Sequence, residues 1–303
     1  MERVLFSPKK IDYPLIFSLL PLAFLYGGAL YLRRLFAKPK DFGVKIVSIG
    51  NLVIGGSGKT PFAIELINYF EAKGLKVGYL SRGYKRESKG LVAVKEGGEI
   101  VCDVRRCGDE AMVVAKECGC EVVVSEDRGE GIEYLKRRGV DLVILDDGFS
   151  KVNIKKFDIL LEPYEIKNRF PLPAGGLREF YFTKKYANLV LKEGRDFKRE
   201  VRVESRDKDR FLLVTAISKP QRLKRYLPSN VVGSYYLSDH SFFDKEIIEK
   251  KMKEVGANRI LSTSKDFVKL EEFKLDIEVL ELKLHINLEI LREIERFVDE
   301  KED

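Results

Sequence analysis

A lysine and a threonine end a glycine-rich stretch in which side chains and backbone could together bind phosphate. The stretch reads GNLVIGGSGKTP over residues 50–61, and its functional members are Gly55, Gly56, Ser57, Gly58, Lys59 and Thr60. In a P-loop, backbone N–H groups cradle the phosphates, the lysine neutralises the β and γ oxygens, and the hydroxyl reaches Mg²⁺. The strict pattern G-x-x-x-x-G-K-[ST] would need glycine at Val53. We therefore predict a variant P-loop, with an ordinary glycine-rich turn as the alternative.

A strand and a helix must position this loop. Residues 44–49 (VKIVSI) form a short apolar run rich in β-branched residues, which favours a buried strand. From Pro61 onward, apolar residues recur at helical spacing, and proline suits the first turn of a helix. The predicted order of strand, loop and helix is the setting that a P-loop requires.

Polar residues also follow two other predicted strands. Asp146 and Asp147 come directly after the apolar run 140–145, where a carboxylate of a P-loop site holds Mg²⁺ or its waters. A pair of helix-capping aspartates is the alternative. Arg82 and Tyr84 lie in a polar loop after another apolar run, at the sheet edge where ligands bind, or in a solvated turn.

Two further residues are candidates for acid–base chemistry. Asp109 opens a predicted helix, where it is either a general base facing a phosphate site or a partner of the helix dipole. His240, one of two histidines in the chain, follows a predicted strand in an Asp-His sequence. It either presents a catalytic dyad or is structural.

Composition limits the class of protein. The chain has 303 residues, 45% hydrophobic and 34% charged, which is enough for one large or two medium globular domains. The net charge of +7 suits a polyanionic substrate, an anionic lipid surface or plain solvation. No basic stripe with interleaved aromatic residues occurs, so we expect no nucleic-acid partner. The four cysteines do not have a usual zinc spacing, and we interpret them as core or loop residues.

The N-terminal segment is apolar and flanked by basic pairs. Residues 13–32 contain no charged residue, and twenty apolar residues suffice to span a bilayer. Two prolines and a Gly-Gly pair within the segment argue against an uninterrupted spanning helix, and a cleaved signal peptide does not suit a P-loop enzyme. We therefore favour an interfacial anchor over a spanning helix, and a spanning helix over a buried core helix.

These elements predict an α/β protein. We expect a P-loop NTPase-like sheet with helices on both faces, a smaller C-terminal α/β domain, and an N-terminal hydrophobic helix that contacts a membrane. The expected boundaries are 1–40 for the anchor, 41–205 for the P-loop domain and 206–303 for the smaller domain. Residues 192–210 are densely charged without apolar periodicity, and we interpret them as a linker.

Several segments together resemble one family, the tetraacyldisaccharide 4′-kinases, which phosphorylate the lipid A precursor at the inner membrane of Gram-negative bacteria. In the family's order, the matching segments are SIGNLVIGGSGKTP at 48–61, LSRGYKR at 80–86, CGDE at 107–110, EDR at 126–128, LDDGF at 145–149, LPAGGLRE at 172–179, SDH at 238–240 and KDFVKL at 265–270. The variant P-loop is the form that this family has.

The resemblance implies a reaction and a place for it. The enzyme would use ATP and Mg²⁺ to transfer the γ-phosphoryl group to the 4′-hydroxyl of a tetraacyldisaccharide 1-phosphate. This step of lipopolysaccharide biosynthesis forms lipid IVA. The enzyme would be peripheral or monotopic at the cytoplasmic face of the inner membrane. Its expected partners are the lipid substrate and the membrane surface, and we expect a monomer.

The resemblance also implies roles for the candidate residues. Asp109 would activate the sugar hydroxyl, and His240, brought in from the smaller domain, would orient or tune it. Lys59 and Thr60 would hold phosphates and metal, and the aspartates at 146 and 147 would take part in the metal and catalytic site. The residues expected to bind substrate are Arg82, Tyr84, Arg128, Arg178 and Glu179.

The chain departs from the family at three points. Ser150-Lys151 follows DDGF where the family usually has Gln-His, Ala111 replaces a proline after GDE, and Ser241 follows Asp-His. These changes bear on substrate geometry and acyl-chain preference, because the ionisable residues remain.

Rival functions fit the sequence less well. A membrane-associated P-loop ATPase that acts as a switch or positioning protein is the main alternative, but its class carries a lysine where this chain has Ile54. A GTPase would need a base-reading Asn/Thr-Lys-x-Asp sequence, which residues 264–266 do not match. A kinase of a soluble substrate would leave the apolar N-terminus without a role.

Overall fold

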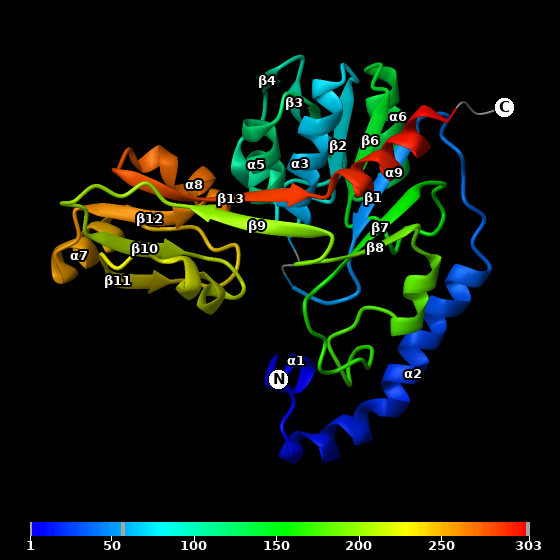
Figure 1. Ribbon diagram of the computed structural model, residues 1–303, viewed down its shortest axis with the longest axis horizontal. Coiled ribbons are helices and arrows are strands. Elements are labelled where there is room, and N and C mark those ends of the chain that lie inside the picture. The colour runs from blue at the N-terminus through cyan, green and yellow to red at the C-terminus, as the bar shows by residue number, and fades with distance from the viewer. Residues whose placement is uncertain (1, 56–57, 301–303) are drawn as a thin grey trace.

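Eight strands form the larger sheet, in the order β4-β3-β5-β2-β6-β1-β7-β8. The computed structural model describes residues 2–55 and 58–300 and is drawn in Figure 1. The strands are β1 (Lys45–Gly50), β2 (Val77–Ser81), β3 (Val92–Glu96), β4 (Glu99–Ile100), β5 (Glu121–Val124), β6 (Leu142–Asp146), β7 (Phe157–Glu162) and β8 (Leu189–Lys192). All pairings are parallel except those of β3 with β4 and with β5. Runs of buried apolar residues are typical of a parallel sheet that is covered on both faces.

Helices cover both faces of this sheet, as predicted. On one face, α3 (Lys59–Ala72), α5 (Asp109–Glu117) and α9 (Leu288–Asp299) pack into a single apolar core. On the other face, α6 (Arg128–Arg137) packs against a second core. The short α4 (Val104–Cys107) precedes α5. The expected α/β fold of the P-loop type is confirmed.

The smaller sheet has five strands in the order β11-β10-β12-β13-β9. Its strands are β9 (Phe197–Arg202), β10 (Phe211–Thr215), β11 (Val231–Tyr236), β12 (Arg259–Thr263) and β13 (Ile277–Ile286), and its helices are α7 (Lys245–Val255) and α8 (Ser264–Leu270). Short 3-10 segments complete the fold: η1 (Lys10–Asp12), η2 (Tyr181–Tyr186), η3 (Pro220–Tyr226) and η4 (Glu271–Phe273).

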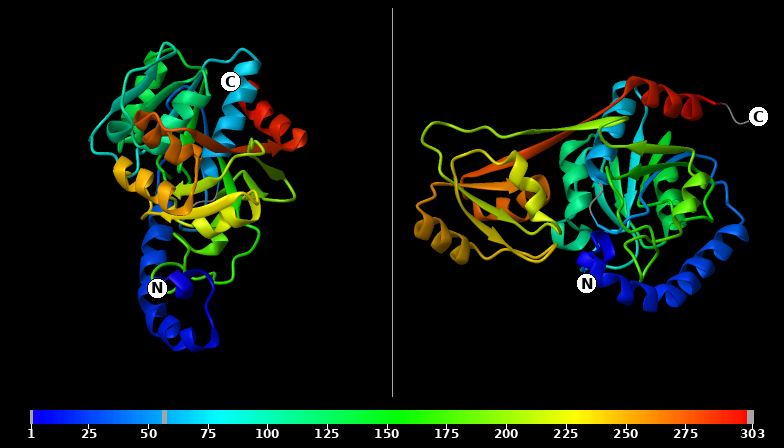
Figure 2. Two further views of the ribbon diagram at one scale, coloured as in Figure 1. Left: turned by 90° about the vertical axis from the view of Figure 1, so that its left-hand side faces the viewer. Right: turned by 60° about the horizontal axis from the view of Figure 1, so that its bottom comes forward.

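The linker expected at 192–210 is wrong, because β9 lies inside it. Strand β9 pairs antiparallel with β13, and Phe197 at its start is buried while most of its other side chains are partly exposed. Charged residues are compatible with such an edge strand, so the sequence there lacks an apolar pattern. Figures 1 and 2 show β9 and β13 crossing together between the two sheets.

Beyond β13, α9 returns to the larger sheet, where the Phe297 and Phe157 ring centroids are 4.9 Å apart. We retain the boundaries 40/41 and 205/206 as a proposal.

The N-terminal helix α2 (Tyr13–Leu35) is continuous, so the expectation that prolines interrupt it is wrong. One proline lies in the first turn, where its missing N–H is not needed, and the helix continues through Pro21. One face packs on the protein: Ile16, Ala23 and Gly27 are buried, and a Cβ on Gly27 would lie 2.8 Å from the Phe180 ring. A short helix, α1 (Glu2–Phe6), precedes it.

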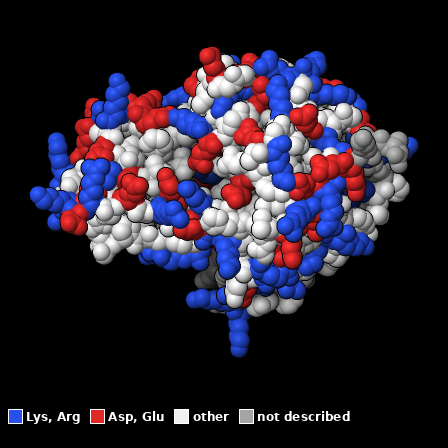
Figure 3. Space-filling model, turned by 45° about the horizontal axis from the view of Figure 1, so that its top comes forward, with Lys and Arg blue, Asp and Glu red and all other residues white. Residues whose placement is uncertain are grey.

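The opposite face of α2 is apolar and uncovered. Its exposed large apolar side chains are Tyr13, Leu15, Phe17, Leu22, Phe24, Leu25, Tyr26, Leu32 and Leu35. Residues 10–35 are long and apolar enough to cross a bilayer, and 17% of the most apolar window is buried. Elsewhere the surface looks different: Figure 3 shows acidic and basic side chains interspersed over the face in view, as on an ordinary solvated surface.

Candidate active site

The carboxyl ends of β1, β2 and β6 meet at one edge of the larger sheet. Ile49 in β1 is paired with Asp146 in β6, and Leu80 in β2 is paired with Leu145. Because the strands are parallel, the loops that follow them share this edge, where open α/β sheets bind ligands. Every candidate residue of the sequence analysis that follows one of these strands is therefore brought to the same region.

The glycine-rich loop joins β1 to the N-terminus of α3. Gly58 precedes the helix with φ of 82°, a backbone conformation that favours glycine, and a Cβ there would lie 2.6 Å from Arg199 Nη2. Gly55 also has a positive φ. The predicted loop residues Gly56 and Ser57 lie outside the described residues. The described part fits a loop whose backbone approaches an anion at a helix N-terminus.

Lys59 and Thr60 are in the first turn of α3. The Lys59 Nζ lies 3.3 Å from Asn51 Oδ1 and 3.3 Å from Asp147 Oδ1, while Thr60 is buried. Asn51 was not predicted, although a polar residue directly after a buried strand is a signal for it. The structure thus brings Lys59 and Asp147 together as expected of the two halves of a P-loop site.

The two aspartates after β6 have different surroundings. Asp146 is buried, its Oδ2 accepts a 2.8 Å hydrogen bond from the Tyr79 hydroxyl, and burial, with the nearby Glu110 charge, raises its pKa to about 6. Asp147 has φ of 54° and lies 2.5 Å from Arg178 Nη1. Burial opposes ionisation of Asp147, but the positive charges of Lys59 and Arg178 hold the pKa of its carboxyl below the usual value.

Asp146 has the chemistry of a Mg²⁺ ligand. Its Oδ1 is buried without a hydrogen-bond partner. Among residues 2–55 and 58–300, no group of three or more His, Cys, Asp or Glu side chains forms a ready metal cage. Magnesium commonly binds through one or two carboxylates together with substrate phosphates, so Asp146, Asp147 and the Thr60 hydroxyl fit this ion.

Asp109 is at the start of α5 and His240 is in the turn after β11, and the two side chains lie in contact. His240 Nδ1 is 2.9 Å from Asp109 Oδ1, and both side chains are nearly buried. The backbone N–H of His240 donates to Ala216 O, and the Tyr84 ring packs edge-on at 5.2 Å between centroids. Residues 131 apart in sequence therefore form the pair that the resemblance implies.

Two lysines of α8 complete the surroundings of Asp109. Lys269 Nζ lies 3.6 Å from Asp109 Oδ2 and 3.1 Å from Asp266 Oδ1, and Lys265 pairs with Glu110. Burial opposes ionisation of Asp109, but the hydrogen bond to His240 and the charges of both lysines lower its pKa. The KDFVKL segment belongs to the family resemblance, but no role was predicted for its lysines. Their i, i+4 spacing, which places both on one helix face, was the available signal.

A cationic group lies beside the aspartates. Arg128 is buried, donates to Ser125 O and lies 3.5 Å from Asp146 O, while Arg82 is exposed in the loop after β2. Burial lowers the pKa of Lys151, and the nearby charges of Arg128 and Arg82 lower it further. Lys151 stands at one of the departures from the family pattern and was missed as a site residue. Three cations so close favour an anionic ligand.

Glu179 has a different partner from the one expected. It is buried, and both of its carboxylate oxygens accept hydrogen bonds from Arg34 at the end of α2. Its neighbour Arg178 reaches the site, because the segment that carries them pairs with the residues before the glycine-rich loop: the Arg178 N–H donates to Leu52 O. Arg34 was not predicted.

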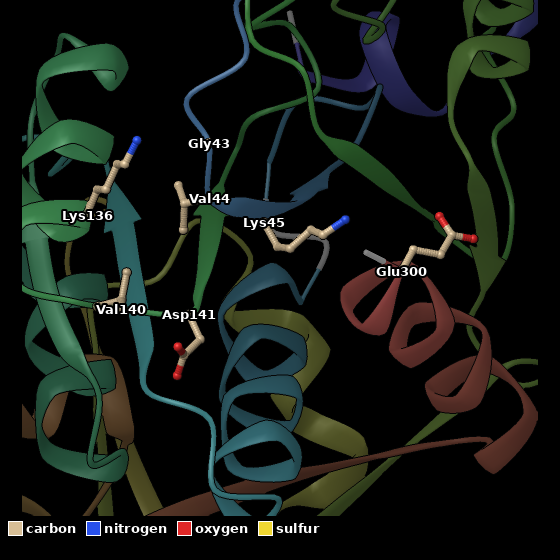
Figure 4. A pocket seen from close by; sticks show the side chains of 7 residues that line it. All are labelled: Gly43, Val44, Lys45, Lys136, Val140, Asp141 and Glu300. Atoms are coloured by element: carbon tan, nitrogen blue, oxygen red, sulfur yellow. The ribbon is translucent and has the colours of Figure 1, made fainter. Parts of the chain in front are cut away.

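A cavity of about 420 Å³ lies at the opposite edge of the sheet, and Figure 4 shows its lining. Lys45 begins β1, Asp141 precedes β6, and Lys136 comes from α6. These are the amino ends of the strands, far from the glycine-rich loop along the strand direction. The cavity is therefore not the site of phosphate chemistry.

Known proteins resemble the chain over almost its full length. The tetraacyldisaccharide-1-P 4′-kinase family model matches residues 15–302. The tetraacyldisaccharide 4′-kinase of Helicobacter pylori strain HPAG1 is 40% identical over 301 residues, 98% of this chain and 94% of the relative. That of Aliarcobacter butzleri is 43% identical over 295 residues, 95% of this chain and 92% of the relative. The crystal structure of LpxK from Aquifex aeolicus in complex with ATP aligns with a TM-score of 0.78 at 28% identity, covering 94% of this chain and 99% of that one.

Proposed function

The chain belongs to the tetraacyldisaccharide 4′-kinase family, and from that premise we propose how its residues carry out the family's reaction. The reaction is ATP-dependent phosphorylation of the 4′-hydroxyl of a tetraacyldisaccharide 1-phosphate in lipid A biosynthesis. The observation that best supports the roles below is the contact of Asp109 with His240 beside the sheet edge that carries Lys59, Asp146 and Asp147.

Lys59 and the loop backbone bind the nucleotide phosphates. The N–H groups at the start of α3 and the Lys59 ammonium neutralise negative charge on the β and γ phosphates. Asp146, Asp147 and Thr60 would hold Mg²⁺, which would supply positive charge to the nucleotide phosphates. Arg128, Arg82 and Lys151 supply further positive charge for phosphate groups, and Arg178 fixes Asp147.

Asp109 accepts the proton of the sugar hydroxyl. The 4′-oxygen forms a bond to the γ-phosphorus, the bond to the bridging oxygen breaks, ADP leaves, and the hydroxyl proton moves to the Asp109 carboxylate. His240 holds that carboxylate through its Nδ1, and Lys269 stabilises its negative charge. Asp109 must be ionised to act, and its lowered pKa keeps it so at neutral pH.

Helix α2 places the enzyme on the membrane that holds its substrate. One face is packed on the protein and the other is an uncovered apolar face, so the helix suits insertion into one leaflet, with the exposed Lys9 and Lys10 at the headgroups. We assign a monotopic, monomeric enzyme to the cytoplasmic leaflet of the inner membrane, where ATP is available.

Phosphoryl transfer itself is the test of the nucleotide site. With γ-labelled ATP and a tetraacyldisaccharide 1-phosphate in detergent micelles, we expect labelled product only when Mg²⁺ is present, and at least about tenfold less product with Lys59→Ala. Product formed equally well in excess EDTA would contradict the metal assignment. ATP hydrolysis with no labelled lipid would contradict the proposed acceptor chemistry.

Membrane binding is expected to depend on the uncovered face of α2. Leu22 and Leu25 are 55% and 72% exposed, so Leu22→Ser with Leu25→Ser should leave folding unchanged. The two leucines together contribute about 3–6 kcal/mol when buried in the bilayer, so partition to vesicles with anionic headgroups should weaken about 10²- to 10⁴-fold. Flotation with vesicles measures the change. Leu288→Ser on α9, also exposed, is the matched control. Equal partition of the α2 variant and wild type would exclude this face as the anchor.

A further inference from the structure

We propose that Arg34, the second-last residue of α2, is a positioning residue that holds the Asp147–Arg178 pair in place. Through it, correct seating of the membrane-contacting helix becomes a condition for phosphoryl transfer. The inference rests on the roles proposed above for Asp147 and Arg178, and it gives Glu179 a role other than substrate binding.

The Arg34 guanidinium makes several buried contacts at once. Its Nη2 donates to Glu179 at 2.9 and 3.2 Å and to the backbone oxygen of Phe149 at 3.1 Å, and its Nε donates to Glu179 at 3.3 Å. The two side chains are only 8% and 6% exposed. The guanidinium carbon also lies 4.3 Å from the centroid of the Phe149 ring. One side chain thus ties two segments of the chain together.

These two segments carry the residues of the site. Glu179 directly follows Arg178, and Phe149 comes two residues after Asp147. Arg178 and Asp147 are themselves 2.5 Å apart, so the contacts form a closed ring that begins and ends at Arg34. Phe149 also rests on the end of β1, because a Cβ at Gly50 would lie 2.5 Å from Phe149 Cβ.

Asp147 needs such support. Its φ of 54° is unfavourable for a residue other than glycine, and such a conformation persists only where surrounding contacts determine it. The neighbouring Arg33 reinforces the same segment by donating to Ser150 O. Two consecutive arginines at the end of α2 therefore bind the loop that directly follows the aspartates.

Arginine is required for this geometry. A planar guanidinium can donate to a carboxylate and a carbonyl at the same time, whereas a lysine ammonium is a single point of charge. Both oxygens of Glu179 accept hydrogen bonds from Arg34 and the side chain is only 6% exposed, which leaves the substrate little access to this carboxylate. Truncating the chain before residue 36 would remove this contact as well as the apolar face, so loss of activity on truncation would not by itself report membrane binding.

Kinetics of Arg34→Lys and Glu179→Gln test the inference. The acceptor is presented in detergent micelles, so that vesicle docking does not limit the rate, and vesicle partition and Tm are measured separately. We expect kcat to fall about 10- to 100-fold in both variants, with KM for the acceptor within about threefold of wild type and partition unchanged. The double variant should be no worse than the poorer single one, because both substitutions break the same contact.

A reference variant makes the outcome decisive. Arg202→Lys changes an exposed Arg–Glu pair outside the site and should leave kcat within twofold of wild type. Wild-type kcat in folded Arg34→Lys and Glu179→Gln, or a loss confined to vesicle partition, would overturn the inference. If Arg34→Lys does not fold, Glu179→Gln alone decides in the same way.

Asp147→Ala separates failure of the inference from failure of the site assignment. If Asp147→Ala loses turnover while the Arg34 and Glu179 variants keep it, only the positioning role fails. If Asp147→Ala keeps wild-type kcat, the assignment of Asp147 fails, and the positioning role fails with it.

Discussion

Replacing Asp109 with asparagine should lower kcat about 10²- to 10⁴-fold, the range in which a positioned general base contributes. The amide keeps an oxygen that can accept the hydrogen bond from His240, so the contact between α5 and the turn after β11 is retained while the basic group is lost. KM for ATP should change little, because Lys59 and the loop backbone bind the phosphates. Steady-state transfer of labelled phosphate measures both constants.

His240→Gln provides the control for this result. Glutamine can still donate to Asp109 but cannot be charged, so we expect a smaller loss, and the double variant should lose less than the sum of the two single effects. The pKa of Asp109 is lowered in the folded protein. In the wild-type rate profile, the loss of activity that protonation of Asp109 causes should therefore appear only below its usual pKa. The charge of His240 also lowers the pKa of Asp109, and glutamine cannot supply that charge, so the acid limb should move to higher pH in His240→Gln. Near-wild-type kcat in Asp109→Asn would exclude the carboxylate as the base.

Sequence alone predicted those parts of the site whose residues are adjacent in the chain. A glycine-rich run followed by Lys59 and Thr60 after a strand, and an aspartate pair after another strand, identify loops at a sheet edge, because parallel strands place their carboxyl ends together. Strand and helix positions in the larger sheet followed from apolar periodicity for the same local reason.

The parts that sequence alone could not supply are contacts between distant segments. Local patterns left a purely structural role open for both Asp109 and His240. Only the family resemblance implied that the two residues form a pair, and the structure places them 2.9 Å apart. Arg34 belongs to the basic pair after the apolar segment, and only the structure shows that it is buried against Glu179. Strand β9 was missed because a charged edge strand carries no apolar pattern, and its partner β13 lies some 80 residues further on.

Asp146→Asn is expected to abolish most activity and yet to stabilise the protein. Losing the anionic oxygen from the proposed metal site should lower kcat by at least about 10²-fold. The folded-state pKa of Asp146 is about 6 against a usual 3.8, so the folded state binds this proton more tightly than the unfolded state does. Stability is therefore lost as pH rises from about 4 to 6, and the full cost of the buried charge is present above that range.

The stability gain can be bounded. Raising the pKa of Asp146 from 3.8 to about 6 corresponds to about 3 kcal/mol, from which an unpaired buried amide N–H subtracts about 1–2 kcal/mol. We therefore expect Asp146→Asn to raise the free energy of unfolding by about 1–2 kcal/mol at pH 7.5 and to leave it unchanged or lower at pH 4. Urea unfolding in EDTA without nucleotide, at both pH values, measures this difference.

Asp147→Asn is the matched control and should change stability in the opposite direction. The folded-state pKa of Asp147 is lowered, because Lys59 and Arg178 outweigh the effect of burial, so its ionised form contributes stability above the usual pKa that is lost as pH falls. Its removal leaves two cations facing each other without their shared partner. The two substitutions at adjacent aspartates are thus expected to lower turnover alike but to change the free energy of unfolding in opposite directions at pH 7.5. A stability loss of similar size in both variants would show that Asp146 is held as an ordinary paired carboxylate, not as an uncompensated buried one.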